Sequence, residues 1–144
     1  MSEKSEQNKE LVRRFMDAVN RGDIDAFDEL CVEDYVWRGV DPEGIGEAKG
    51  LPAFKEAVGS FLRAMPDLKV QILEMVAEDA AVATHLLESG HHTGAPWLGV
   101  EPKGALVEWH AYDIYRIRDG KLATESFLDD GYTIMKALGI KTLA

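Results

Sequence analysis

The hydrophobic pattern of the chain changes its period once, near the middle, and this change limits the fold more than any other feature. Before Pro66, apolar residues recur every three or four positions, as on one face of a helix. After Leu68 they alternate with polar residues, as in half-buried strands. Helices followed by a run of strands indicate an α+β layout. One curved sheet with helices across its concave face would accommodate both patterns.

Three helices are predicted in the first half of the chain. The first covers residues 5–20 and ends at Arg21-Gly22. Asp23 then caps a second, short helix. Pro52 suits the first turn of a third helix, which ends at Pro66.

The second half is expected to form an antiparallel meander, followed by a short final helix. The alternating segments are residues 68–77, 80–90, 106–117 and 122–128. Asp119-Gly120 predicts a tight hairpin, because this pair readily adopts positive φ angles. In the first half, residues 35–37 indicate a short strand, and the glycine-rich stretch 38–50 a loop that could act as a mobile lid.

The composition restricts the partners and the compartment. With 144 residues the chain is expected to form one domain, 1–144, in which residues 1–7 are a flexible N-terminus. The formal net charge of −10 argues against nucleic acid and against an anionic membrane as partners. Cys31 is the single cysteine, which excludes an internal disulfide and suits a reducing compartment. No signal sequence or membrane-length apolar run is present, so we expect a cytoplasmic protein.

Alternation divides the strand predicted at 106–117 into two faces. One face carries Glu108, His110, Tyr112, Ile114 and Arg116. The other carries Val107, Trp109, Ala111, Asp113, Tyr115 and Ile117. The first face mixes titratable and apolar groups, which is typical of the wall of a small-molecule site, although a solvated sheet face would have the same composition.

No motif for a metal, a phosphate or a nucleophile is evident. His91 and His92 are neighbours on a strand, so they point to opposite faces and do not chelate one ion easily. The glycines of 44–50 lack the Lys-Ser/Thr of a phosphate loop, and no serine lies in a Gly-x-Ser-x-Gly elbow. Acid/base chemistry by carboxylate and imidazole groups remains.

Two carboxylates, Asp129 and Asp130, stand where the last predicted strand meets the last helix. An aspartate there can cap the helix, because its side chain accepts hydrogen bonds from the first free amides. It can equally lie at the mouth of a pocket and transfer protons. The sequence pattern alone leaves both uses open.

Four blocks of sequence, in this order and spacing, resemble the SnoaL-like polyketide cyclases of the nuclear-transport-factor-2-like superfamily. They are Asn20-Arg21-Gly22-Asp23 with Asp34-Tyr35-Val36-Trp37; Met65-Pro66-Asp67-Leu68; Gly90-His91-His92-Thr93-Gly94; and Ile114-Tyr115-Arg116 with Asp119-Gly120, Glu125, Asp130 and Leu138-Gly139. The resemblance covers about residues 8–140. It implies an α+β cone: a strongly bent antiparallel sheet wrapped around the N-terminal helices, with a pocket at the open end.

The resemblance also implies a reaction, namely ring closure by intramolecular aldol addition without a metal or an organic cofactor. A carboxylate at the start of the last helix is the acid/base of the family. Counted back from Leu138-Gly139, this position is Asp130, and Asp129 is the second choice. The family often has Trp where this chain has Ser126, and His where it has Arg38, so the pocket differs in shape and polarity.

The predicted site therefore has Asp130 as base and acid, with His110 or His92 stabilising the oxyanion. The further substrate-binding candidates are Tyr112, Arg116, Arg38, Trp37, Phe61, Trp97 and Phe127. The expected ligand is a small apolar or aromatic molecule. A homodimer through the outer sheet face is expected, with Trp109 and Tyr115 supplying apolar surface. The alternatives are a non-catalytic small-ligand binding protein and an isomerase or epoxide hydrolase on the same fold.

Overall fold

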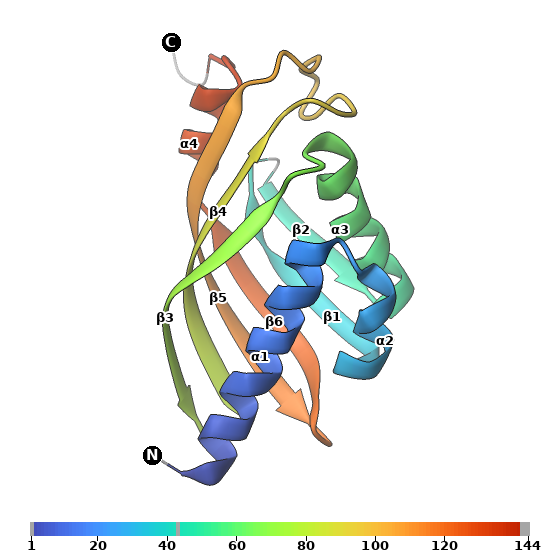
Figure 1. The fold of residues 1–144 in the computed structure, drawn as a ribbon, viewed down its shortest axis with the longest axis vertical. Helices are drawn as coiled ribbons and strands as arrows, with labels where there is room; N and C mark the ends of the chain where they lie inside the picture. The colour runs from blue at the N-terminus through green and yellow to red at the C-terminus, as the bar shows by residue number, and fades with distance from the viewer. Residues whose placement is uncertain (1, 43, 142–144) are drawn as a thin grey trace.

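The computed structural model describes residues 2–42 and 44–141, which form a curled sheet with helices packed across its concave side (Figure 1). The helices are α1 (Glu3–Arg21), α2 (Phe27–Leu30), α3 (Leu51–Ala64) and α4 (Gly131–Ala137), with a 3₁₀ turn, Ile24–Ala26, before α2. The strands are β1 (Cys31–Asp41), β2 (Gly44–Lys49), β3 (Lys69–Glu78), β4 (Ala81–His91), β5 (Leu106–Arg118) and β6 (Lys121–Asp129). The α+β layout is thus confirmed. No helix in the described part of the chain is long and apolar enough to cross a membrane.

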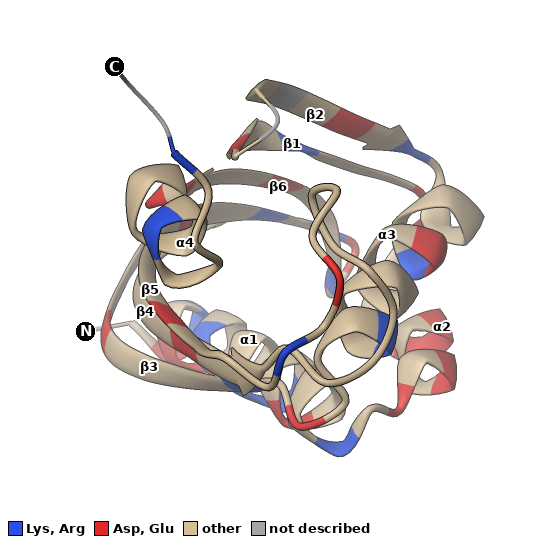
Figure 2. Cartoon of the chain, turned by 90° about the horizontal axis from the view of Figure 1, so that it is seen from above, with Lys and Arg blue, Asp and Glu red and all other residues tan. Residues whose placement is uncertain are grey.

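The sheet is mixed, whereas the sequence predicted an antiparallel one. Its strand order is β2-β1-β6-β5-β4-β3. Strands β3 to β6 form the predicted meander, but β1 joins it by running parallel to β6. Viewed from above, the sheet curves around one side of the molecule, and α1 and α3 lie opposite β6 (Figure 2). The strongly bent sheet around N-terminal helices is therefore as expected, except for this one parallel pair.

The loop predicted for residues 38–50 is wrong. Strand β1 continues to Asp41, and β2 pairs with it antiparallel from Val36↔Lys49 to Asp41↔Gly44. Glycine is depleted in strands, so the composition of this stretch favoured a loop. Because β2 is an edge strand held by main-chain hydrogen bonds to β1, its side chains have little influence on the pairing. Residues 38–41 and 44–49 thus belong to two paired strands of the sheet and do not form a lid.

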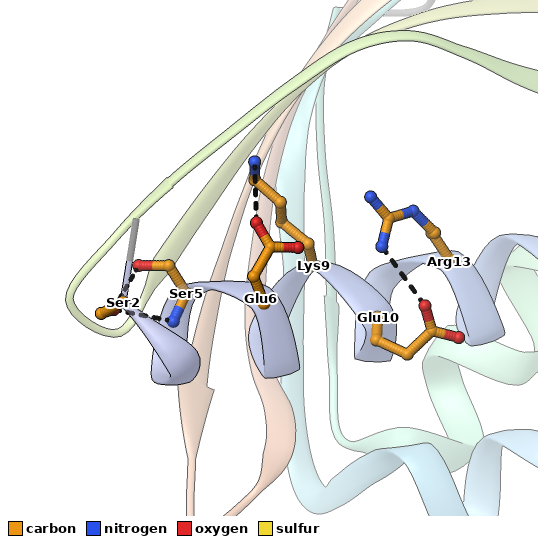
Figure 3. A network of polar contacts seen from close by, with 6 residues as sticks. All are labelled: Ser2, Ser5, Glu6, Lys9, Glu10 and Arg13. Carbon is orange, nitrogen blue, oxygen red and sulfur yellow. Dashed lines mark hydrogen bonds and ion pairs between the residues drawn. The ribbon is translucent and has the colours of Figure 1, made fainter.

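Helix α1 begins at Glu3, inside the segment that we expected to be a flexible N-terminus. The hydroxyl of Ser2 caps it by accepting a hydrogen bond from the amide of Ser5 at 3.1 Å. Two ion pairs at i,i+3 spacing follow along the helix (Figure 3): Glu6 with Lys9 at 3.9 Å and Glu10 with Arg13 at 3.2 Å. Such local pairs add a few tenths of a kcal/mol, roughly, to helix stability. The cap and the pairs fix the start of the helix that lies across the sheet.

Phe54 of α3 is the centre of the aromatic core that fixes the helices on the sheet. Its ring centroid lies 6.0 Å from that of Phe15 on α1 and 5.6 Å from that of Phe27 on α2. It also lies 4.6 Å from Tyr35 and 6.3 Å from Trp37, both on β1. The ring of Phe54 thus connects α3 with α1, with α2 and with the first strand. Such ring pairs stabilise a core beyond their buried area.

The two faces of β5 are the reverse of the assignment favoured by the sequence. Trp109 and Tyr115 are buried, at 2% and 1% exposure, so they cannot supply an outer apolar surface. The outer face instead exposes Tyr112, Ile114 and, on β6, Leu128. The inner face has the larger number of apolar side chains, and burial of these outweighs the mixed polar character of the other face. The homodimer stays a prediction.

We expect Phe54→Ala to lower the free energy of unfolding by about 3–5 kcal/mol, because it removes a fully buried ring that four other rings contact. Chemical denaturation monitored by circular dichroism measures the change. Val76→Ala on β3 is the control, since Val76 is 58% exposed and should cost less than about 1 kcal/mol. Equal losses in the two variants would contradict the central position of Phe54.

Candidate functional site

A cavity of about 80 Å³ lies inside the curl of the sheet, between its inner face and helices α1 and α3. Its apolar wall is largely aromatic and includes Phe15, Trp37, Phe54, Phe61, Trp109 and Phe127. Four acidic residues also line it: Glu88, Asp113, Glu125 and Asp129. Among the described residues that line the cavity, none is Lys, Arg or His. An apolar pocket with several convergent polar groups of one charge sign is the best candidate for a functional site in this molecule.

Strand register brings the four carboxyl groups together from three neighbouring strands. On β6, Glu125 and Asp129 lie two positions to either side of Phe127, so all three share the inner face. Asp113 of β5 is paired with Phe127 in the register, which places it between the two acids of β6. Glu88 of β4 is paired with Trp109 of β5. The acidic group is thus a property of the sheet and does not depend on loops.

Asp113 and Glu125 form a buried pair that shares a proton. Their carboxyl groups are hydrogen-bonded to each other, which requires one of them to be protonated. The hydroxyl of Tyr35 donates to Glu125 Oε1 at 2.7 Å, and that of Tyr115 donates to Asp113 Oδ2 at 3.0 Å. Burial raises the pKa of Asp113 to about 6. Burial and then the charge of Asp113 raise the pKa of Glu125 well above its usual range, so the proton resides on Glu125.

The second oxygen of Asp113 has an unusual environment. Asp113 is 6% exposed, and in the described part of the chain no N–H or O–H group with a fixed proton donates to its Oδ1 atom. Protonated Glu125 can satisfy this oxygen only by turning its own proton toward it. A buried acceptor without a donor lowers the stability of the folded protein by about 1–3 kcal/mol. The folded state therefore favours an arrangement in which this oxygen receives a hydrogen bond.

Asp129 and Glu88 form a second interacting pair, and both carboxyl groups lie near the indole N–H group of Trp109. Trp109 Nε1 donates to Asp129 Oδ1 at 3.4 Å. Burial, followed by the charge of Asp113, raises the pKa of Asp129 to about 7. Burial and then the charges of Asp129 and Asp113 raise the pKa of Glu88 well above its ordinary value. Both side chains are half-buried, because they face the cavity. The raised pKa of Glu88 favours its protonated form, while Asp129 is partly ionised at neutral pH.

Three of the predicted wall residues, Trp37, Phe61 and Phe127, do line the cavity. The rings of Trp37 and Phe127 are stacked at 4.2 Å between centroids. Gly39 permits this arrangement, because a Cβ atom at Gly39 would lie 2.0 Å from the carbonyl oxygen of Phe127. Trp97 lies behind the wall and contacts the rings of Phe61 and Trp109 at 5.9 and 6.1 Å.

Asp130 and His110, the predicted catalytic pair, do not line the cavity. Asp130 is the exposed N-cap of α4, where its side chain accepts from the amide of Thr133 at 3.1 Å and from the Thr133 hydroxyl at 2.5 Å. These bonds lower the pKa of the Asp130 carboxyl. His110 is exposed on the outer face, with Nδ1 2.8 Å from Nε2 of His85. The reason is register: a strand residue one position out of phase points to the opposite face.

The remaining predicted substrate-binding residues also lie outside the cavity. His92 is buried, and its Nε2 atom is 2.8 Å from the carbonyl oxygen of Ala95, so it holds the following loop. Tyr112 stacks on His85 on the outer face, with 4.5 Å between ring centroids. Arg38 is exposed and pairs with Glu47 at 3.8 Å. Arg116 is exposed on the outer face of β5.

The sequence reasoning missed Glu88, Asp113 and Glu125 as site residues, although a signal for them was present. On its inner face β5 carries one charged residue, Asp113, among Val, Trp, Ala, Tyr and Ile side chains. A single carboxylate on an otherwise apolar strand face is costly to bury, so its presence points to function. Counting apolar residues on each face, instead of searching for histidine, would have selected the correct face.

The acidic group is not arranged as a metal site. In the described ranges, no three His, Cys, Asp or Glu side chains are grouped so that they could hold a metal ion. Glu88, Asp113, Glu125 and Asp129 instead interact as pairs that share or exchange protons. The arrangement is therefore suited to proton transfer and to hydrogen bonding with an organic ligand.

The family model of the SnoaL-like polyketide cyclases matches residues 9–138. The chain belongs to this family. The match covers most of α1, the other helices and all strands of the sheet, and hence every strand that lines the cavity. No curated protein sequence matches the chain.

Solved structures share the fold over almost the whole chain. A proposed SnoaL-like polyketide cyclase from Jannaschia sp. CCS1 is 21% identical, with a TM-score of 0.87 over 99% of this chain and 98% of its own. IdmH from Streptomyces antibioticus, a proposed polyketide cyclase, is 23% identical, with a TM-score of 0.80 over 93% and 99% of the two chains. An LEH-like epoxide hydrolase from M. tuberculosis is 18% identical, with a TM-score of 0.74 over 94% and 91%. At these identities the likeness shows a common fold, on which both cyclases and a hydrolase occur.

The raised pKa values predict that the protein becomes less stable as the pH increases from about 4 to about 7. The folded protein keeps protons on Asp113 and Asp129 that the unfolded chain releases above about pH 4, so the stability is complete below that pH and is lost above it. Asp129→Asn should remove part of this loss and make the variant about 1–3 kcal/mol more stable than the wild type at pH 8. Near pH 4 the two should be equal. Denaturation curves from pH 4 to 8 measure this.

Glu101→Gln is the control for the pH experiment, because Glu101 is exposed and lies in the loop between β4 and β5. Its stability should follow that of the wild type at every pH. A wild type whose stability increases steadily between pH 4 and 7, or an Asp129→Asn variant parallel to it, would show that Asp129 has an ordinary pKa.

Proposed function

We propose that this protein is an enzyme that closes a ring by intramolecular aldol addition, using Asp129 as base and acid without a metal or organic cofactor. The pKa of about 7 for the Asp129 carboxyl, in an aromatic cavity, is the observation that carries the proposal. Membership of the SnoaL-like polyketide cyclase family supports the reaction type. The substrate is a small molecule with two carbonyl groups and an apolar or aromatic part.

Asp129 suits the role of base because of its environment. An ordinary carboxylate, with a pKa near 4, is a weak base for a proton on carbon. Burial behind the wall of Trp37 and Phe127 raises the pKa of Asp129 toward the working pH, where a general base is most effective. A positioned base of this kind contributes a factor of about 10²–10⁴ in rate.

Glu88 suits the role of hydrogen-bond donor to the oxyanion. Its pKa is raised well above the usual range, which favours the neutral carboxylic acid, and it faces the same cavity as Asp129. A donor to a developing oxyanion contributes a factor of about 10²–10³. Two neighbouring carboxyl groups whose pKa values are separated in this way supply an acid and a base together.

The reaction then follows with its protons balanced. Asp129 takes the proton from the carbon next to one carbonyl, and Glu88 donates a hydrogen bond to the enolate oxygen that forms. The enolate carbon attacks the second carbonyl, so that a carbon–carbon bond forms and the second C=O π bond becomes an alkoxide. The alkoxide takes the proton back from Asp129, which restores the carboxylate.

Epoxide hydrolysis, the other activity considered, has less support in the cavity. We expected it to require Asp, Asn, Tyr and Arg groups converging on one water. The cavity lining within residues 2–42 and 44–141 contains Asp113, Asp129 and Tyr115 but neither Asn nor Arg. A purely binding function predicts the same cavity without proton transfer, so an activity measurement separates it from our proposal.

Proton abstraction can be measured before the substrate is known. Acetophenone is a small aromatic ketone whose methyl protons exchange slowly with solvent. In D₂O at neutral pH, the wild type should accelerate deuterium incorporation into such ketones, and Asp129→Asn should reduce the protein-dependent rate by about 10²–10⁴-fold. Proton NMR or mass spectrometry follows the exchange.

Asp130→Asn is the matched variant. It has the same change of charge one residue away, and asparagine caps a helix about as well as aspartate. We expect its exchange rate and melting temperature to stay close to those of the wild type. Loss of exchange in Asp130→Asn with retention in Asp129→Asn would favour the original prediction of Asp130. No acceleration by the wild type across a panel of aryl ketones would favour a binding protein.

A further inference from the structure

The charge of the cavity points to a feature of the ligand that aldol chemistry does not require. Acidic side chains are its ionisable groups apart from Tyr115, and no described cationic side chain lines it. Asp113 is mainly ionised at neutral pH, and its Oδ1 atom has no permanent donor within the described residues. The protein thus leaves a buried negative charge beside the cavity, and no described cationic side chain of the lining compensates it.

We propose that the ligand carries a protonated amine, which enters the cavity and is held there by the negative charge of the buried Asp113 carboxylate. The proposal rests on the proposed function in taking this cavity as the substrate site, and it adds the substrate class: a small amine-bearing carbonyl compound. An ammonium group has three N–H donors and no acceptor, so it complements carboxylates that otherwise face one another.

The aromatic wall favours the same ligand. A cation over the face of Trp or Phe is attracted by the negative charge of the ring face. Trp37 and Phe127 form a stacked pair on the wall, and Phe54 lies 6.3 Å from Trp37. A cation surrounded by rings alone would still be costly to desolvate, but here it would be paired with at least one carboxylate. Rings and carboxylates together form a site for an organic cation.

Other ligands fit these observations less well. An anion would face Asp113 and Asp129 without a cationic partner, so it should be excluded. A metal ion would need three or more grouped ligands, which the described residues do not provide. A neutral alcohol could donate one hydrogen bond inside the cavity but would leave the charge of Asp113 uncompensated. These three classes are the comparisons for the experiment.

Binding of three probes of nearly equal size tests the proposal: benzylamine, benzyl alcohol and benzoate, measured by calorimetry and by thermal shift at pH 7.5. One-ring probes are chosen because the cavity is small, with a volume of about 80 Å³. Benzylamine should bind about 10- to 100-fold more tightly than benzyl alcohol, as expected for hydrogen bonds to a charged partner. Benzoate should not bind. Because the protein has a net charge of −10, the titrations are repeated in 0.5 M NaCl, where attraction at the surface is screened.

Asp113→Asn should reduce the preference for the amine over the alcohol to about 3-fold or less, since the amide removes the charge but keeps the shape. Glu101→Gln, an exposed carboxyl outside the cavity, should keep the full preference. If Asp113→Asn does not fold, as judged by circular dichroism, the pH gives the second test: in the wild type the preference for the amine should be lost as the pH falls from 7.5 to about 5, because Asp113, with a pKa of about 6, becomes protonated. Equal binding of amine and alcohol, or an unchanged preference in Asp113→Asn, would overturn the proposal.

Chlorides of sodium, potassium, magnesium and calcium form a further arm. Displacement of benzylamine by one of these at low millimolar concentration would assign the cavity to a metal ion and would also overturn the proposal. Because only binding is measured, the result is independent of turnover. Amine binding without ketone exchange would contradict the proposed function alone, and ketone exchange without amine preference would contradict this inference alone.

Discussion

Four carboxyl groups share one small cavity, and the fold has to prevent them from repelling one another. It does so with protons, because Glu125 keeps its proton and bonds to Asp113, while Tyr35 and Tyr115 each donate to one of the two. These hydrogen bonds join β1, β5 and β6 at the centre of the sheet. A buried polar network of this kind fixes one arrangement when it is fully satisfied and is costly when it is not. The relative position of these three strands therefore depends on it.

The same constraint provides the means for chemistry. Like charges in a dry cavity cannot all be ionised, so their pKa values separate. Asp129, which faces the cavity and accepts from Trp109, has a pKa of about 7, and burial together with the charge of Asp129 raises the pKa of Glu88 well above its usual range. In the proposed mechanism, two residues of the same kind thus serve as acid and base. The cost is stability at neutral and high pH, which the aromatic packing around Phe54 offsets.

Much of the fold could be predicted from the sequence, but the site could not. Hydrophobic period gave the helices and the four strands of the meander, because period reflects which side is buried. It missed β2 because an edge strand rich in glycine resembles a loop, and it missed the parallel pairing of β1 with β6 because register between distant segments leaves no local pattern. On the sequence alone Asp130 is preferred over Asp129 as the pocket carboxylate, but Asp130 lies outside the cavity. The reason is related: a shift of one residue along a strand turns the side chain to the opposite face of the sheet. His110 attracted attention by its chemistry, whereas Asp113 was indicated by its apolar neighbours.

The parallel pairing of β1 with β6 has a consequence for how the protein is made. Strand β1 (residues 31–41) pairs with β6 (residues 121–129), so the ladder between them can close only after both segments have been synthesised. Contacts between such distant segments slow folding, because a long loop must be closed first. The cavity, which β1 and β6 both line, is therefore complete only after this late pairing has formed.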